Sequence, residues 1–374
     1  MATTPALQRT WLDRSANYSR ACATRNDLRL LNHVTTRDSA LDMESIRIAL
    51  GQRKINYYGF SYGTYLGSVY GSLFPSHLRR AVFDSTVDPR DVWYRANLAQ
   101  DQAFTTTSKA FFSWVARHDA YYHLGSTEQQ VESLYYGVQD QLRRTPKNDG
   151  KVGPDEWADA FLPAGYYQLT WLDVADLFVQ AVKHDDYAPV TASIEGPKDD
   201  DNGYAMYLAT QCTDTSWPQS YSGTWKPDVL RTAADNPFLT WANNWYNAPC
   251  LTWPAAPQKP VTVDGRDVAS VLMVDETLDA ATPYEGSLEV RSRFPGARLI
   301  SLPGGTSHAV TLFGNACTDN AIAAYFRDGT LPSRKAGRTS DKQCAPLPEP
   351  TPGASSTALL APHRPAPVLP RSAG

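Results

Sequence analysis

The order of apolar and polar positions predicts a first region in which short buried strands alternate with helices. Residues 54–58 and 80–84 are apolar runs of strand length, and between them residues 64–73 repeat apolar side chains at helical spacing. A further helix is expected over residues 38–50, where apolar residues recur every three or four positions and a glycine follows. A strand, a helix and a second strand in this order are typical of a parallel βαβ unit.

The same alternation returns towards the C-terminal end. Residues 268–274 form a strongly apolar run that predicts a strand, a helical pattern follows over 284–293, and residues 297–302 are typical of another strand. A helix over 318–326 ends this region. We therefore expect one parallel sheet with helices on its faces, an α/β fold.

The stretch between these regions, residues 92–253, is mainly helical in pattern and holds nine of the ten tryptophans. It predicts an inserted cap, in which most aromatic side chains form a core and a minority line a pocket against the sheet. Residues 1–37 are polar and weakly patterned, and no element is assigned to them. The expected division is residues 1–91 and 256–344 for the α/β core, 92–255 for the cap, and 345–374 for a disordered tail rich in Pro and Ala.

Charge and composition exclude several classes of function. The formal net charge is -4 and no basic stripe is present, so nucleic acid is not an expected partner. The apolar runs are too short to span a membrane, and residues 1–13 lack a signal-peptide pattern. The acidic run before Gly203 places Lys198 where a calcium loop needs its first ligand, which predicts a solvated loop.

The five cysteines indicate disulfides more than a metal site. None forms a CxxC pair and no histidine cluster accompanies them, so zinc is not expected. Their spacing favours the pairs Cys212–Cys250 and Cys317–Cys344, which leaves Cys22 outside both; free buried thiols are the alternative.

Candidate chemistry begins at Gly59-Phe60-Ser61-Tyr62-Gly63. A G-x-S-x-G string is weak by itself, but here it lies between a predicted buried strand and a predicted helix, the context of the nucleophile elbow of an α/β-hydrolase. We expect a strained backbone at Ser61, with Gly59 and Gly63 relieving crowding. Ser61 is the predicted nucleophile, which needs a base to take its proton.

The base and the acid should follow later strands, in the chain order serine, acid, histidine. Of the seven histidines, only His308 follows a glycine-bearing turn after the last predicted apolar strand. Three acids follow the strand that ends at residue 274, namely Asp275, Glu276 and Asp279. The pattern alone leaves the choice among them open.

Several segments together resemble the tripeptidyl aminopeptidases, bacterial and usually secreted serine exopeptidases related to proline iminopeptidase. The resemblance extends from about Cys22 to Cys344. It is carried by residues 56–67 around the elbow, 278–283, 304–308, and 212–214 and 249–254 of the cap.

The resemblance implies that Asp279 is the acid of a Ser61-His308-Asp279 triad that transfers acyl groups, with the backbone N–H of Tyr62 as one oxyanion donor. The implied substrate is a peptide with a free N-terminus, cut into short peptides, and the implied location is outside the cell. Asp214 of the cap is the candidate to pair with the substrate α-ammonium. Neither a metal nor an organic cofactor is implied.

One departure from the family pattern concerns the region before the elbow. Only about fifty residues precede it, without the strands that normally flank the nucleophile strand and without the glycine-rich segment that supplies a second oxyanion donor. Losing one such donor costs on the order of a hundred- to a thousandfold in kcat. We expect an N-terminally incomplete sheet with an open edge, the C-terminal part of a longer enzyme, and a partner for Cys22 in the absent segment.

The departure leaves alternatives open. The chain is expected to be either an aminopeptidase that is active once those strands are supplied, a related proline iminopeptidase or esterase, or a non-catalytic remnant of such an enzyme. The oligomeric state is not predicted.

Overall fold

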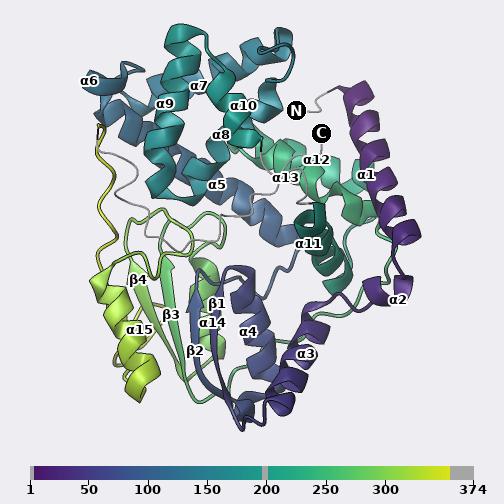
Figure 1. The fold of residues 1–374 in the computed structure, drawn as a ribbon, viewed down its shortest axis with the longest axis vertical. Helices are drawn as coiled ribbons and strands as arrows, with labels where there is room; N and C mark the ends of the chain where they lie inside the picture. The colour runs from purple at the N-terminus through teal and green to yellow at the C-terminus, as the bar shows by residue number, and fades with distance from the viewer. Residues whose placement is uncertain (1–3, 196–200, 354–374) are drawn as a thin grey trace.

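A computed structural model describes residues 4–195 and 201–353 of the chain. Its centre is a five-stranded sheet in the order β1-β2-β3-β4-β5, and all four neighbouring pairs are parallel (Figure 1). The strands are β1 Ile55–Phe60, β2 Leu78–Asp84, β3 Val271–Glu276, β4 Ala297–Leu302 and β5 Lys342–Gln343. The four predicted strands are confirmed, whereas the two-residue β5 is too short to show in an apolar pattern.

Helices cover both faces of the sheet. The core helices are α3 Thr36–Ala49, α4 Tyr62–Leu73, α14 Glu285–Arg293 and α15 Ala316–Asp328. Neighbouring residues of β2 show how the faces divide: Phe83 is in one apolar cluster with Tyr65 of α4, and Val82 is in another with Ile322 of α15. Because successive side chains of a strand point to opposite faces, one short strand joins both layers of the core. This three-layer arrangement is an α/β-hydrolase fold.

The chain between β2 and β3 forms a cap, which lies above the carboxyl ends of the strands (Figure 1). It is helical, as predicted. Its aromatic side chains form a core of their own, in which Trp114, Trp157 and Trp171 are almost fully buried. The helices of the cap are α5 Tyr94–Arg117, α6 Asp119–Tyr122, α7 Glu128–Arg144, α8 Pro154–Tyr166, α9 Trp171–His184, α10 Ala188–Ile194, α11 Asp201–Asp214, α12 Lys226–Asp235 and α13 Thr240–Asn247.

The N-terminal region, for which no element was predicted, is helical. Helix α1 Pro5–Arg25 begins at an N-cap, Thr4, whose hydroxyl accepts the N–H of Leu7, and the short α2 Leu28–Leu31 follows. Helix α1 is polar overall, and it is held by a few contacts with the cap. Trp11 stacks on Trp245, for example, at 6.0 Å between ring centroids. A helix supported by tertiary contacts rather than by an apolar stripe leaves little pattern in the sequence.

Two other loop predictions are corrected in part. Residues 345–353, predicted to be disordered, pack on the cap: the indole N–H of Trp114 donates to the carbonyl of Pro350 at 3.0 Å, and Arg117 pairs with Glu349 at 2.7 Å. The rest of the predicted tail, residues 354–374, lies outside the described residues. The acidic run predicted as a solvated loop enters helix α11 at Asp201, and its earlier part also lies outside the described residues.

Both predicted disulfides are confirmed. Cys212 is bonded to Cys250 within the cap, and Cys317 is bonded to Cys344 beside β5. Cys22 is buried and belongs to neither bond. Within the described residues, no cluster of potential metal ligands is found, and no helix is both long and apolar enough to cross a membrane.

Strand β1 forms one edge of the sheet. Phe60 at its carboxyl end is 39% exposed, and the neighbouring α3 exposes Ile46, Ile48 and Leu50 by 59 to 66%. The open edge that the sequence predicts is therefore present in the described part of the chain.

Candidate active site

The turn from β1 into α4 has the geometry of a nucleophile elbow. Ser61 has φ 52° and ψ -124°, a backbone conformation that non-glycine residues rarely adopt. Gly59 is required beside it, because a Cβ there would lie 2.6 Å from the carbonyl oxygen of Gly63. The prediction for Gly63 is wrong: a Cβ at that position would meet nothing closer than 3.6 Å.

Helix α4 presents its N-terminus at this turn. Tyr62 is its first residue, so the Tyr62 N–H is among the four that have no acceptor within the helix. Such an N–H, at the positive end of the helix dipole, suits an oxyanion. The backbone of Ser61 is itself fixed, because its N–H donates to the carbonyl of Asp84 at 3.0 Å.

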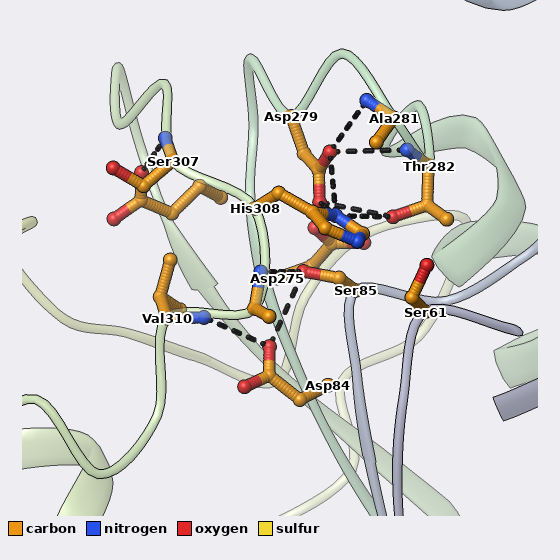
Figure 2. Close-up of polar contacts among 12 residues, drawn as sticks. Ser61, Asp84, Ser85, Asp275, Asp279, Ala281, Thr282, Ser307, His308 and Val310 are labelled. Carbon is orange, nitrogen blue, oxygen red and sulfur yellow. Dashed lines mark hydrogen bonds and ion pairs between the residues drawn. The ribbon is translucent and has the colours of Figure 1, made fainter. Parts of the chain in front are cut away.

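The loops that follow β3 and β4 bring a carboxylate and an imidazole together. His308 Nδ1 lies 2.8 Å and 3.1 Å from the two carboxylate oxygens of Asp279 (Figure 2). The carboxylate also accepts the N–H groups of Ala281 and Thr282 and the hydroxyl of Thr282, at 2.9 to 3.0 Å. Both residues are buried, and four donors together fix the orientation of Asp279.

The environment of His308 favours its charged form. Burial lowers the pKa of this imidazole, but the charge of Asp279, the hydrogen bond to Asp279 and the charge of Asp84 outweigh it, so the net pKa is raised above 6.5. A stronger base accepts a proton from a serine more readily.

Ser61 and His308 line the same cavity. Figure 2 shows the Ser61 side chain beside the imidazole. No hydrogen bond joins the two side chains among the described residues. In enzymes without substrate such bonds are often long and tighten only in the complex.

The other two candidate acids have different partners. Asp275 accepts the hydroxyl of Ser287 at 2.6 Å, and Glu276 accepts the N–H of Ser307 at 2.5 Å. Burial raises the pKa of Asp275 well above its ordinary value and that of Glu276 to about 8. Of the three acids that the pattern left open, Asp279 is the one that contacts the imidazole.

The cavity has a volume of about 1780 Å³ and lies between the cap and the carboxyl edge of the sheet. Helix α8 contributes one continuous face to it, through Asp155, Asp159, Leu162 and Tyr166. Tyr166 also contacts His308: the backbone N–H of His308 donates to the carbonyl of Tyr166 at 2.8 Å, and the two rings meet edge to face with their centroids 5.9 Å apart.

Asp214 is not placed where the prediction needs it. It lies outside the residues that line this cavity, and it is 5% exposed. Its carboxylate accepts the N–H and the hydroxyl of Thr36, each at 2.6 Å, and the indole N–H of Trp93 at 3.1 Å. Burial raises its pKa, while these donors oppose the rise. Asp214 therefore anchors α3 to the cap and does not reach the substrate space.

Sequence reasoning missed several residues around the imidazole, namely Thr282, Tyr166, Asp84 and Ser85. One signal was available for Asp84: it ends a predicted strand, and polar residues at the carboxyl ends of parallel strands gather at one edge. No local signal marks Tyr166, whose contribution is a backbone carbonyl.

Comparisons with known proteins show which families the chain is similar to. Residues 236–344 match the family model described as TAP-like protein. The chain is 42% identical to a tripeptidyl aminopeptidase of Streptomyces lividans over 90% of this chain and 62% of that protein. The chain is a homologue of the tripeptidyl aminopeptidases.

Two more distant relatives come from Mycobacterium tuberculosis. The protein named serine protease Hip1 is 27% identical over 83% of this chain and 63% of its own length. The protein named carboxylesterase B is 31% identical over 87% of this chain and 63% of its own length. The chain thus spans about three fifths of the length of these two relatives, and about the same share of the Streptomyces tripeptidyl aminopeptidase.

Proposed function

We propose that this tripeptidyl aminopeptidase homologue is a serine hydrolase that releases short peptides, tripeptides in particular, from the free N-terminus of a polypeptide. The observation that carries the proposal is the geometry at one cavity: a strained serine at a helix N-terminus and an imidazole held by a buried carboxylate. The names of the relatives support the substrate class.

The reaction is acyl transfer. His308 takes the proton of the Ser61 hydroxyl, which attacks the peptide carbonyl; the oxyanion faces the N–H of Tyr62. His308 then protonates the leaving amine and later activates a water that releases the acyl group. Asp279 keeps the Nδ1 proton in place and stabilises the imidazolium, without taking that proton itself.

The length of the released peptide is related to helix α8. Seven residues separate Asp159 from Tyr166 along one face, roughly 10 Å at 1.5 Å per residue. Three residues of an extended peptide span about the same distance. Since Tyr166 contacts His308, a tripeptide bound to Ser61 would bring its α-ammonium near Asp159. Asp159 therefore replaces Asp214 as the candidate for ammonium binding.

Two other functions share this site. The relative named carboxylesterase B favours an esterase, because the same triad chemistry cleaves esters. The open edge at β1, beside the nucleophile, favours a chain that needs a further polypeptide segment for activity, or one without activity.

A fluorophosphonate probe and three substrates distinguish these functions. We expect the probe to label the wild type but not Ser61→Ala, and a tripeptidyl anilide to be cleaved faster than its N-acetylated form or a single-residue anilide. Asp159→Asn should raise KM for the free tripeptidyl substrate and leave the acetylated one unchanged. Equal cleavage of free and acetylated substrates would indicate an esterase or endopeptidase, and the absence of labelling a non-catalytic chain.

A further inference from the structure

Two adjacent residues at the carboxyl end of β2, Asp84 and Ser85, lie between the loop of the nucleophile and the loop of the base (Figure 2). Both are fully buried. The carbonyl of Asp84 accepts the N–H of Ser61 at 3.0 Å, and the hydroxyl of Ser85 accepts the N–H of Ala309, next to His308, at 2.7 Å. Asp84 and Ser85 therefore contact both the loop that carries Ser61 and the loop that carries His308.

Ser85 holds an unfavourable backbone conformation. Its φ is 61°, and that of its partner Ala309 is 57°. Left-handed backbone is unfavourable at a non-glycine residue, and it persists where the surrounding contacts enforce it. Here the Ser85 N–H donates to the carbonyl of Val274 at 3.0 Å, so strand β3 helps to hold the turn.

The carboxylate of Asp84 continues the same set of contacts. It accepts the N–H of Thr311 at 2.9 Å, the N–H of Val310 at 3.3 Å, and the hydroxyl of Ser85 at 3.3 Å. The Thr311 hydroxyl donates to it as well. Asp84 and Ser85 thus bind three consecutive N–H groups, those of residues 309 to 311, directly after the histidine.

We propose that Asp84 and Ser85 are positioning residues, which fix the Ser61 hydroxyl and the His308 imidazole relative to each other through a shared turn on β2. The inference rests on the proposed serine-hydrolase chemistry. A displacement of about 1 Å at a reacting group costs on the order of a hundredfold in rate, so a loop held by fewer hydrogen bonds should react measurably more slowly. A role in stability alone predicts no such loss.

Ser85→Gly separates the two roles. Glycine accepts the positive φ, and this relief offsets part of the stability that is lost with the buried hydroxyl, so the variant should remain folded with a melting temperature near that of the wild type. We expect its kcat and its rate of fluorophosphonate labelling to fall at least tenfold, with KM within twofold. The matched control is Ser301→Ala, which removes a buried hydroxyl of β4 that donates to Ser340 and not to the loop of the base. It should lose stability but keep its rate.

A second measurement does not depend on turnover. Proton NMR of the wild type should show a downfield signal for the hydrogen on His308 Nδ1, and in Ser85→Gly this signal should broaden through faster exchange with water. If the wild type is not labelled at Ser61, the proposed function fails, and the NMR signal alone decides the positioning role. If the wild type is labelled and Ser85→Gly keeps both its rate and its signal, this inference fails and the proposed function stands.

Discussion

The substitution Asp279→Asn tests the assignment of the acid most directly. The asparagine oxygen can still accept the N–H groups of Ala281 and Thr282, which lie 2.9 and 3.0 Å from one carboxylate oxygen. The amide nitrogen then faces His308 Nδ1, where it offers a hydrogen instead of accepting one. His308 should respond by carrying its proton on Nε2, the atom that must accept the proton of Ser61.

The structure allows the size of this effect to be bounded. A wrong tautomer of the base costs about 10⁴-fold in kcat in a Ser-His-Asp triad, equivalent to about 5.5 kcal/mol of transition-state stabilisation. The hydroxyl of Thr282 lies 3.3 Å from Nδ1 and can accept its hydrogen in place of the lost carboxylate. We therefore expect a loss of about 10³- to 10⁴-fold, and a further loss in the double variant with Thr282→Val.

The assay is the rate of acylation of Ser61 by a fluorophosphonate, together with kcat for a tripeptidyl anilide. Asp275→Asn is the matched control, because Asp275 is equally buried, belongs to the same segment and binds Ser287 instead of the imidazole. Asp279→Asn retaining a tenth of the wild-type rate, or Asp275→Asn losing more, would refute the assignment of Asp279.

Two further predictions concern stability. The pKa of Glu276 is about 8 in the folded protein, whereas its ordinary value is 4.5. Between pH 4.5 and pH 8 the folded state therefore keeps a proton that the unfolded state has released. The free energy of unfolding should fall as the pH rises through this range. Glu276→Gln keeps an acceptor for Ser307, and its melting temperature, measured by calorimetry from pH 5 to 9, should fall less than that of the wild type; parallel curves would contradict the assignment. Replacing Cys212 and Cys250 by serine opens a link across 38 residues and should lower the free energy of unfolding by about 2 to 4 kcal/mol in urea titrations, whereas an unchanged midpoint would show that the bond does not form.

Local pattern was enough to predict the sheet and the position of the serine. A strand that enters a glycine turn and leaves as a helix is encoded within about twenty consecutive residues, and so is the apolar run of β3. The pattern also predicted a histidine after a later strand, although β5, which follows it in the chain, was missed. Local pattern was not enough to identify the acid, because three carboxylates follow β3. Asp279 is distinguished by a turn in which two backbone N–H groups donate to its carboxylate. This depends on backbone geometry, which the residue pattern does not show.

The misplaced Asp214 and the missed Ser85 have a common cause. Asp214 was assigned from a cap motif, but its partner Thr36 lies 178 residues away. Ser85 meets Ala309 across 224 residues, and the contact depends on how β2 lies relative to a loop from another strand. Residue type and spacing do not contain that information, which arises only when the sheet is assembled.

The hydrogen bond from the backbone N–H of His308 to the carbonyl of Tyr166 joins the loop of the general base to helix α8 of the cap. A polypeptide substrate reaches Ser61 through the cavity between the cap and the sheet. Any movement that lifts α8 also withdraws the acceptor that fixes the histidine loop. If α8 moves in this way when a polypeptide enters, the protein would bind substrate in one form and catalyse in the other. The form with α8 lifted would then hydrolyse small esters poorly.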